Sequence, residues 1–320
     1  MREHRVVPDA HRQARGGLSA VGSRLNIQPP GDYLFKRDVC SYGYFLLPPN
    51  VWDPLTLTLT RPLTLDDGVA TFVLSQPNDA PGAPIHAEVD RTISRPEQAT
   101  ARRLITRMLR LDDAGVAAFH RVDRRWKKSG RGRIFRSPSF FEDLVKTVTS
   151  CNVVWASTVT MNRRLCEVIA PAFPSPGQLA RRRAATLRSR CGVGYRDTRL
   201  IALAKMVLRG ELDPDWFEDP TTSDDDAYTA LLALPGIGPY AAGNMMQLLG
   251  RYGFLAIDSE SIKHGKTALG FSGSDRTIEK QVRAHFERFG EHRFRSCWFE
   301  MWERYEAKQG PAWTWAPRSA

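Results

Sequence analysis

The chain has 320 residues, enough for one large domain or two ordinary ones. Hydrophobic residues make up 42% and charged residues 25% of it, which excludes a disordered, collagen-like or coiled-coil protein. Lysine and arginine number 46 against 35 aspartates and glutamates, a net charge of +11. This surplus favours a polyanionic partner such as nucleic acid; the alternative is a protein whose basic surface has no ligand.

The sequence carries no signal for membrane insertion or export. No apolar run approaches the roughly 18 residues of a membrane span, and the first 17 residues lack the apolar centre of a secretory signal. Five scattered cysteines form no CxxC pair, which argues against disulfides, a structural zinc site or a cysteine-bound cluster. We therefore expect a monomer of the cytoplasm and nucleoid, or of the nucleus in a eukaryote, that is not secreted.

The first third of the chain predicts strands. Residues 1–30 are polar, rich in arginine and without pattern, as expected of a mobile tail. In residues 51–65, leucine and threonine alternate with period two, and residues 69–76 are rich in β-branched side chains. Asp66, Asp67 and Gly68 between these runs indicate a hairpin turn. We expect an antiparallel β subdomain over residues 31–99.

The remainder of the chain predicts helices. From about residue 98 the apolar residues recur at helical spacing. The fold class is therefore α+β, with a β-rich N-terminal subdomain and a larger, all-helical domain over residues 100–320. The first helix places Ala101, Leu104, Ile105, Met108 and Leu109 on one face, and further amphipathic helices are expected over residues 137–150, 154–169, 196–210 and 224–234 and from Tyr240 onward.

Charge is distributed unevenly along the helical part. Residues 121–136 contain eight lysines and arginines against one aspartate, and residues 181–190 contain five arginines. Both segments could contact phosphates. Residues 211–226 contain eight acidic residues and no basic one, and we expect a solvated loop that faces away from a polyanion.

A short turn in residues 234–240 offers a way to bind phosphate. Leu234-Pro235-Gly236-Ile237-Gly238 lies between two helical patterns. Glycine permits a positive φ and close backbone approach, so Ile237 can insert into the core while backbone N–H groups at the next helix point outward. Such a helix–hairpin–helix turn can bind a phosphate without reading base sequence. The alternative is an ordinary turn between helices.

Asp258 follows Gly238 by twenty residues and begins the helical segment DSESIKHG. The hairpin, the aspartate and the spacing between them together resemble the motif of the helix–hairpin–helix DNA glycosylase superfamily. Residues 172–180, 191–205, 139–169 and 289–306 resemble further segments of that superfamily. The strand-rich N-terminal part resembles the alkyladenine and 8-oxoguanine branches, and the resemblance covers roughly residues 31–308.

The resemblance implies an enzyme that excises a flipped base from double-stranded DNA. Members that also cleave the strand carry a lysine where this chain has Tyr240, so the resemblance implies hydrolysis by a monofunctional glycosylase. Only Cys297 follows Asp258, so no iron–sulfur cluster is expected, whereas relatives hold a monovalent cation at the hairpin. Alkylated purines are the favoured substrates. The alternatives are an oxidised or otherwise modified base, a non-catalytic DNA-binding protein, and a protein-interaction role.

Asp258 is the candidate catalytic residue. Breaking an N-glycosidic bond builds positive charge on the deoxyribose, which a fixed carboxylate can stabilise while it also orients water. The alternative role is a helix N-cap, and the two roles are compatible.

The other candidates surround the extruded base. Tyr240 and Trp155 could stack on it, or could be core aromatics. Asn152 matches an asparagine of the 8-oxoguanine branch, in a loop that fills the gap left in the duplex by the extruded base. The alternative is that Asn152 caps a helix. Asn244, one turn after Tyr240, could bond a base edge, although a packing contact is slightly favoured.

The backbone contacts would come from the hairpin and the helix after it. Gly236, Ile237 and Gly238 supply the N–H groups that hold the DNA backbone. Lys263 could reach a phosphate or could lie on a solvated helix face. His264 has no partner at ligand spacing, so no metal site is expected.

Overall fold

The computed structural model describes residues 22–316 and contains one antiparallel sheet of five strands in the order β1-β5-β4-β3-β2. The first strand lies within the segment that was predicted to be a tail, so the strand-rich part begins at residue 23 rather than 31; residues 1–21 lie outside the described range. The strands are β1 (Ser23–Ile27), β2 (Val51–Asp53), β3 (Thr58–Leu65), β4 (Gly68–Ser75) and β5 (Ile85–Val89).

The predicted hairpin joins β3 and β4. Leu65 pairs with Gly68, which leaves Asp66 and Asp67 as a two-residue turn, and Gly68 has a φ of 109°. The alternation along β3 buries one face of the strand, because every second residue points to the same side of a sheet.

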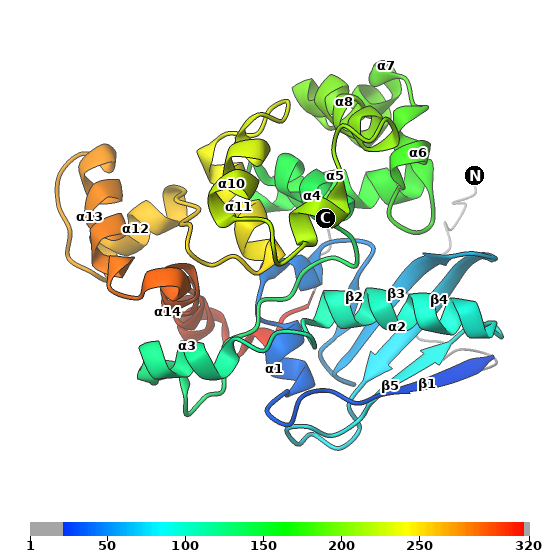
Figure 1. Ribbon diagram of the computed structural model, residues 1–320, viewed down its shortest axis with the longest axis horizontal. Coiled ribbons are helices and arrows are strands. Elements are labelled where there is room, and N and C mark those ends of the chain that lie inside the picture. Colours follow the sequence, from blue (N-terminus) through cyan, green and yellow to red (C-terminus); the bar gives the residue numbers. More distant parts are fainter. Residues whose placement is uncertain (1–21, 317–320) are drawn as a thin grey trace, which may run out of the picture.

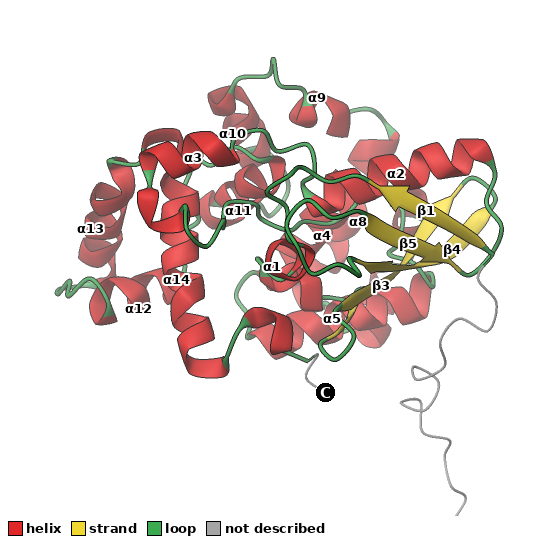
Figure 2. Ribbon diagram, turned by 90° about the horizontal axis from the view of Figure 1, so that it is seen from below, coloured by secondary structure: helices red, strands yellow, loops and turns green. Residues whose placement is uncertain are grey.

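Helices make up most of the rest of the described chain, which confirms the α+β class (Figure 1). Two views show the sheet at one side of the molecule with α2 along it (Figures 1 and 2). No helix within residues 22–316 is long and apolar enough to cross a membrane. The α-helices are α1 (Phe35–Val39), α2 (Arg95–Leu109), α3 (Val116–Val122), α4 (Phe140–Ser150), α5 (Trp155–Ile169), α6 (Pro176–Ala180), α7 (Ala184–Thr186), α8 (Asp197–Leu208), α9 (Pro214–Glu218), α10 (Asp224–Leu232), α11 (Pro239–Leu249), α12 (Ser259–Thr267), α13 (Asp275–Glu287) and α14 (Arg293–Gln309).

Short 3₁₀ or π segments connect the longer helices: η2 (Gly43–Leu46), η3 (Arg124–Trp126), η4 (Leu187–Cys191), η5 (Gly194–Arg196), η6 (Gly290–His292) and η7 (Ala312–Thr314). The segments α1 and η2 interrupt the region that was predicted to hold strands only. They lie between β1 and β2, and η2 contributes to the candidate site described below.

Helix α4 is the central element of the helical part. Its residues 140–149 are all buried, and it packs against α5, α8 and α11. Buried ion pairs join it to the sheet: Arg61 on β3 contacts Glu142, which also pairs with Lys146 at 2.7 Å. Burial opposes the charge on Glu142, but the two cations lower the pKa of its carboxyl. Because each buried charge has a partner, α4 is fixed to the sheet in one arrangement.

Candidate active site

Asp258 is the N-cap of α12. Its Oδ1 accepts hydrogen bonds from the Ser261 backbone N–H at 2.8 Å and from the Ser261 hydroxyl at 2.9 Å. These bonds fix the carboxyl group, and the positive end of the helix dipole favours its negative charge. The side chain is only partly buried, and within residues 22–316 no hydrogen bond occupies its other oxygen. Asp258 therefore acts as a cap through one oxygen and presents the second to its surroundings.

Tyr240 lies in the first turn of α11, close enough to Asp258 for the two groups to interact electrostatically. Burial raises the pKa of the Tyr240 phenol well above its ordinary value, and the negative charge of Asp258 and the proximity of Cys151 raise it further. The Ser150 hydroxyl also interacts with the phenol. The end of α4, the start of α11 and the start of α12 thus converge around Asp258.

Three further residues, which sequence reasoning did not single out, lie close enough to Asp258 for its charge to affect them. The pKa values of Tyr42, Cys297 and Tyr305 are raised first by burial, and the charge of Asp258 adds to each shift. Tyr42 precedes η2 and its ring lies 4.7 Å from that of Trp298, on α14. Aromatic rings from two distant segments of the chain therefore pack together here.

Trp155 is the first residue of α5 and is 42% exposed. Its indole lies against Gly43 of η2, where an added Cβ would come within 3.1 Å of the ring. Gly43 follows Tyr42, which places Trp155 at the edge of the group of residues around Asp258. Because Trp155 is partly exposed, part of its indole is accessible to another ring.

Asn244 makes the packing contacts that were slightly favoured for it, rather than presenting its amide to a base edge. It is 2% exposed, and its Oδ1 accepts from the Tyr42 hydroxyl at 2.6 Å. Its Nδ2 donates to Thr147 Oγ1 at 2.8 Å and to the Tyr44 hydroxyl at 3.3 Å. Because these partners use its amide groups, Asn244 joins α11 to α4 and η2 and has no bond left for a base edge.

Asn152 lies between α4 and α5 in an exposed loop. Its φ is 55°, a left-handed conformation that asparagine tolerates better than most residues. Its Nδ2 donates to the Tyr195 hydroxyl at 3.5 Å. The adjacent Val153 and Val154 are also exposed, so an amide and two apolar side chains project from the loop next to Trp155.

The turn has the predicted conformation, but the Ile237 N–H, which was predicted to help hold the DNA backbone, is used within the turn. Gly236 has a φ of 80°, Ile237 is buried, and the Ile237 N–H donates to the Leu234 carbonyl at 3.1 Å. Gly238 caps α11, and a Cβ at that position would meet open space. The backbone N–H groups at this exposed start of α11 have no carbonyl partner within the helix. They can therefore donate hydrogen bonds to an anion. Lys263 lies on an exposed face of α12, 3.8 Å from Glu260.

The two basic runs differ. Much of the run 121–136 is used within the protein: Arg125 pairs with Asp123 and Glu300, Arg131 with Glu306, and Arg133 with Asp32. That run is therefore a weaker candidate for phosphate binding than its charge suggested. All five arginines of the run 181–190 are exposed, so this segment keeps its predicted capacity to contact phosphates.

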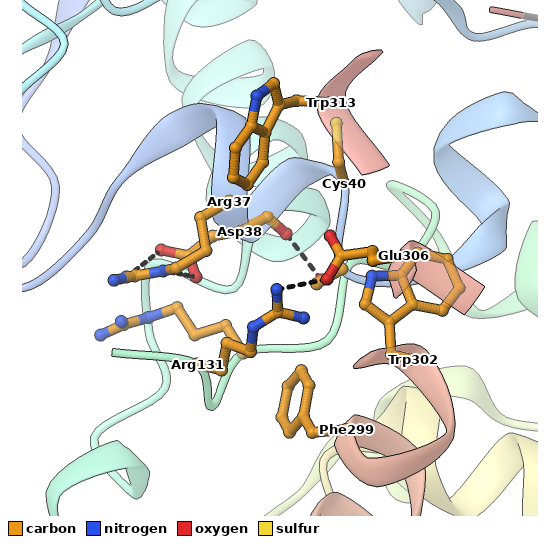
Figure 3. Close-up of a pocket in the computed structure, with 10 residues that line it drawn as sticks. Arg37, Asp38, Cys40, Arg131, Phe299, Trp302, Glu306 and Trp313 are labelled. Atoms are coloured by element: carbon orange, nitrogen blue, oxygen red, sulfur yellow. Dashed lines mark hydrogen bonds and ion pairs between the residues drawn. The ribbon is translucent and has the colours of Figure 1, made fainter. Parts of the chain in front are cut away.

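A small cavity of about 10 Å³ lies between α1, the segment 131–133 and α14 (Figure 3). It holds about one water and is too small for a base. No predicted site residue lines it. Within residues 22–316, no three histidine, cysteine, aspartate or glutamate side chains come together to hold a metal ion.

The sequence matches no known protein-family model and no curated protein. Solved structures do resemble the chain. A 3-methyladenine DNA glycosylase from Archaeoglobus fulgidus has a TM-score of 0.68 at 18% identity, over 88% of this chain and 99% of that one. MBOgg1 in complex with a low-affinity DNA ligand has a TM-score of 0.65 at 16% identity, over 89% and 97%.

The 8-oxoguanine glycosylase/lyase of Clostridium acetobutylicum, solved with double-stranded DNA that carries cytosine opposite 8-oxoguanine, has a TM-score of 0.56 at 15% identity, over 77% of this chain and 88% of that one. The chain thus has the fold of 3-methyladenine and 8-oxoguanine DNA glycosylases. The fold predicted from the hairpin and aspartate is confirmed.

The geometry of the hairpin predicts different effects for its two glycines. Gly238→Val should change the free energy of unfolding by less than about 1 kcal/mol, because the new side chain meets open space. It should nevertheless weaken binding to all duplexes similarly, since its bulk keeps phosphates from the N–H groups. Gly236→Ala should lower the melting temperature, because φ is 80° there.

Thermal unfolding and duplex titrations check both effects. Gly31→Val is the matched control, since a Cβ at residue 31 also meets open space. A loss of affinity confined to one DNA sequence in Gly238→Val would contradict a backbone-binding role.

Proposed function

We propose that the protein is a monofunctional DNA glycosylase that hydrolyses the bond between deoxyribose and a flipped, damaged or modified base. The observation that carries this proposal is the Asp258 carboxyl group, fixed by α12 through one oxygen and free at the other, beside Tyr240. The likeness to solved glycosylases supports it. The alternative is a hairpin protein that binds DNA without catalysis, in which Asp258 would be a cap only.

In this mechanism the free oxygen of Asp258 faces the deoxyribose of the extruded nucleotide. As the base departs with the bonding electrons, the carboxylate stabilises the positive charge on the sugar. A water molecule then adds to C1′, its proton is released, and an intact abasic site remains. The bonds to Ser261 prevent the carboxyl from turning away, so little reorganisation is needed during the reaction.

Tyr240 supports hydrolysis without strand cleavage. A phenol cannot form a Schiff base with the opened sugar, and its raised pKa keeps it neutral beside Asp258. Lys146, on the neighbouring α4, is buried and paired with Glu142, and burial lowers the pKa of its ammonium group. The ion pair with Glu142 supports a structural role for this lysine.

The aromatic walls favour alkylated purines as substrates. Many alkylated purines carry a positive charge, and electron-rich faces such as those of Tyr240 and Trp155 attract such rings. One of the similar structures is a 3-methyladenine DNA glycosylase, which agrees with this choice. Another is an 8-oxoguanine glycosylase/lyase, so an oxidised base is the second candidate substrate.

The partner in this proposal is double-stranded DNA, bound by a monomer in the cytoplasm and nucleoid, or in the nucleus of a eukaryote. The reaction as written needs no redox group and no iron–sulfur cluster. The backbone carbonyl oxygens of the turn 234–238 are neutral ligands, which suit a monovalent cation. We therefore propose that such a cation binds at this turn. Its role would be to strengthen the binding of a DNA phosphate by the hairpin.

A panel of duplexes tests the proposal. Each duplex carries one lesion, and alkali reveals abasic sites after incubation with the protein. Asp258→Asn should slow excision about a thousandfold, which corresponds to a loss of about 4 kcal/mol in transition-state stabilisation. Asparagine can still cap α12, so thermal stability and duplex binding should survive. Full activity of Asp258→Asn would refute a catalytic carboxylate.

The product distinguishes hydrolysis from lyase chemistry. With the wild-type protein, strand breaks should appear only after alkali or a separate nuclease, because no lysine stands at residue 240. Borohydride should not link the protein to DNA. Efficient trapping would overturn the monofunctional assignment and would direct attention to Lys263, which is exposed on α12.

Asn152 should act during base flipping. Asn152→Ala should slow excision from duplex DNA by roughly tenfold, because a group that fills the vacated space in the duplex is lost. Single-turnover rates on duplex DNA measure this effect. Thermal stability should fall by at most about 2 kcal/mol, since Asn152 is exposed and makes one long hydrogen bond, although alanine tolerates its φ of 55° less well than asparagine does. A large drop in melting temperature would show that the residue is structural.

A further inference from the structure

The C-terminal end of α4 is held by side chains. The last carbonyls of a helix have no partner within the helix and need one elsewhere. The Thr147 carbonyl accepts from the Ser150 hydroxyl at 2.8 Å, and the Thr149 carbonyl accepts from the Thr158 hydroxyl at 3.3 Å. The Val148 carbonyl, which lies between them, accepts from Arg196 Nε at 3.1 Å.

Arg196 binds more than this one carbonyl. Its Nη2 donates to the carbonyl of Cys151, the residue before Asn152, and its Nη1 donates to the Val193 carbonyl at 3.3 Å. Arg196 is 4% exposed. One buried cation therefore joins the end of α4, the start of the loop that carries Asn152, and the turn that precedes η5. A cation at this end of α4 also complements the helix dipole.

The loop is further linked to the hairpin through Tyr195. The Arg196 guanidinium lies over the Tyr195 ring at 4.5 Å, and that of Arg199 lies over it at 5.0 Å. The stem of Arg199 packs against Gly236, where an added Cβ would come within 2.6 Å of its Cδ. Contacts thus run from Asn152 through Tyr195 and Arg199 to Gly236.

We propose that Arg196 is a positioning residue for the loop that inserts into DNA. Its bonds to the Val148 and Cys151 carbonyls fix the backbone on the N-terminal side of Asn152, so that Asn152 is held in its left-handed conformation before DNA arrives. A non-glycine residue at positive φ is strained and persists only where its surroundings impose it. The proposal rests on the function of Asn152 proposed above.

The test compares Arg196→Lys with Arg209→Lys, a control at the far end of α8 where the arginine is exposed and pairs with Glu211. Lysine keeps the charge but cannot bind several carbonyls through a planar fork. The first measurement needs no DNA: amide hydrogen exchange of residues 147–150, the last turn of α4. We expect exchange there to be at least about tenfold faster in Arg196→Lys and unchanged in the control.

The second measurement is excision of the same lesion from duplex and from single-stranded DNA. A single strand needs no base flipping, so Arg196→Lys should lose activity on duplex, by roughly tenfold, and retain it on single strands. In a double-mutant cycle with Asn152→Ala the losses should not add, because Arg196 acts through Asn152. Equal losses on both substrates, or additive losses, would overturn the proposal.

Two further outcomes keep the test decisive. If Arg196→Lys does not fold, Thr158→Val loosens the same helix end by removing the bond to the Thr149 carbonyl, and the same pattern is expected from it. If the wild type excises no lesion while exchange accelerates as expected, the proposed function fails and the control of the loop by Arg196 stands. Unchanged exchange in Arg196→Lys would overturn the proposal whatever the activity.

Discussion

A carboxylate must be charged, fixed and accessible at once if it is to stabilise a cation, and these demands conflict in a protein interior. The N-cap position of α12 resolves the conflict for Asp258. Its bonds to Ser261 and the helix dipole stabilise the charge, yet they use only one oxygen. The cap and the proposed chemical role are therefore compatible in the same geometry, and the roles proposed for the other site residues depend on their positions relative to Asp258.

That geometry depends on α4. The helix is buried along almost its whole length, and paired charges fix it to the sheet. Its end meets the starts of α11 and α12 near Tyr240 and continues into the loop of Asn152. The residues proposed to act on the nucleotide and the loop proposed to enter DNA thus adjoin one buried helix, which suits a site that needs close positioning. The buried amide of Asn244 adds a bond between α11 and α4.

Local patterns predicted the features that local interactions determine. The alternation in residues 58–65, the turn at Asp66-Asp67, the hairpin with Ile237 inward and the cap at Asp258 all follow from short-range chemistry. Pairing between distant residues could not be predicted from local patterns. The strand β1 lies in an arginine-rich stretch yet pairs with β5. Arginines of residues 121–136 form ion pairs with acidic residues more than 100 positions away. Contacts between residues far apart in the sequence also place Tyr42 and Tyr305 near Asp258 and Arg196 at the end of α4. The packing of Asn244 against Tyr42 is another contact of this kind.

The central claim is that an extruded nucleotide occupies the space between Asp258, Tyr240 and Trp155. A crystal structure of Asp258→Asn bound to a duplex with its best lesion tests this claim directly. We expect the C1′ atom of the extruded nucleotide at about 3.5 Å from the side chain of residue 258, with the base against an aromatic ring. A lesion that stays stacked in the duplex, or a base bound away from residue 258, would contradict the account.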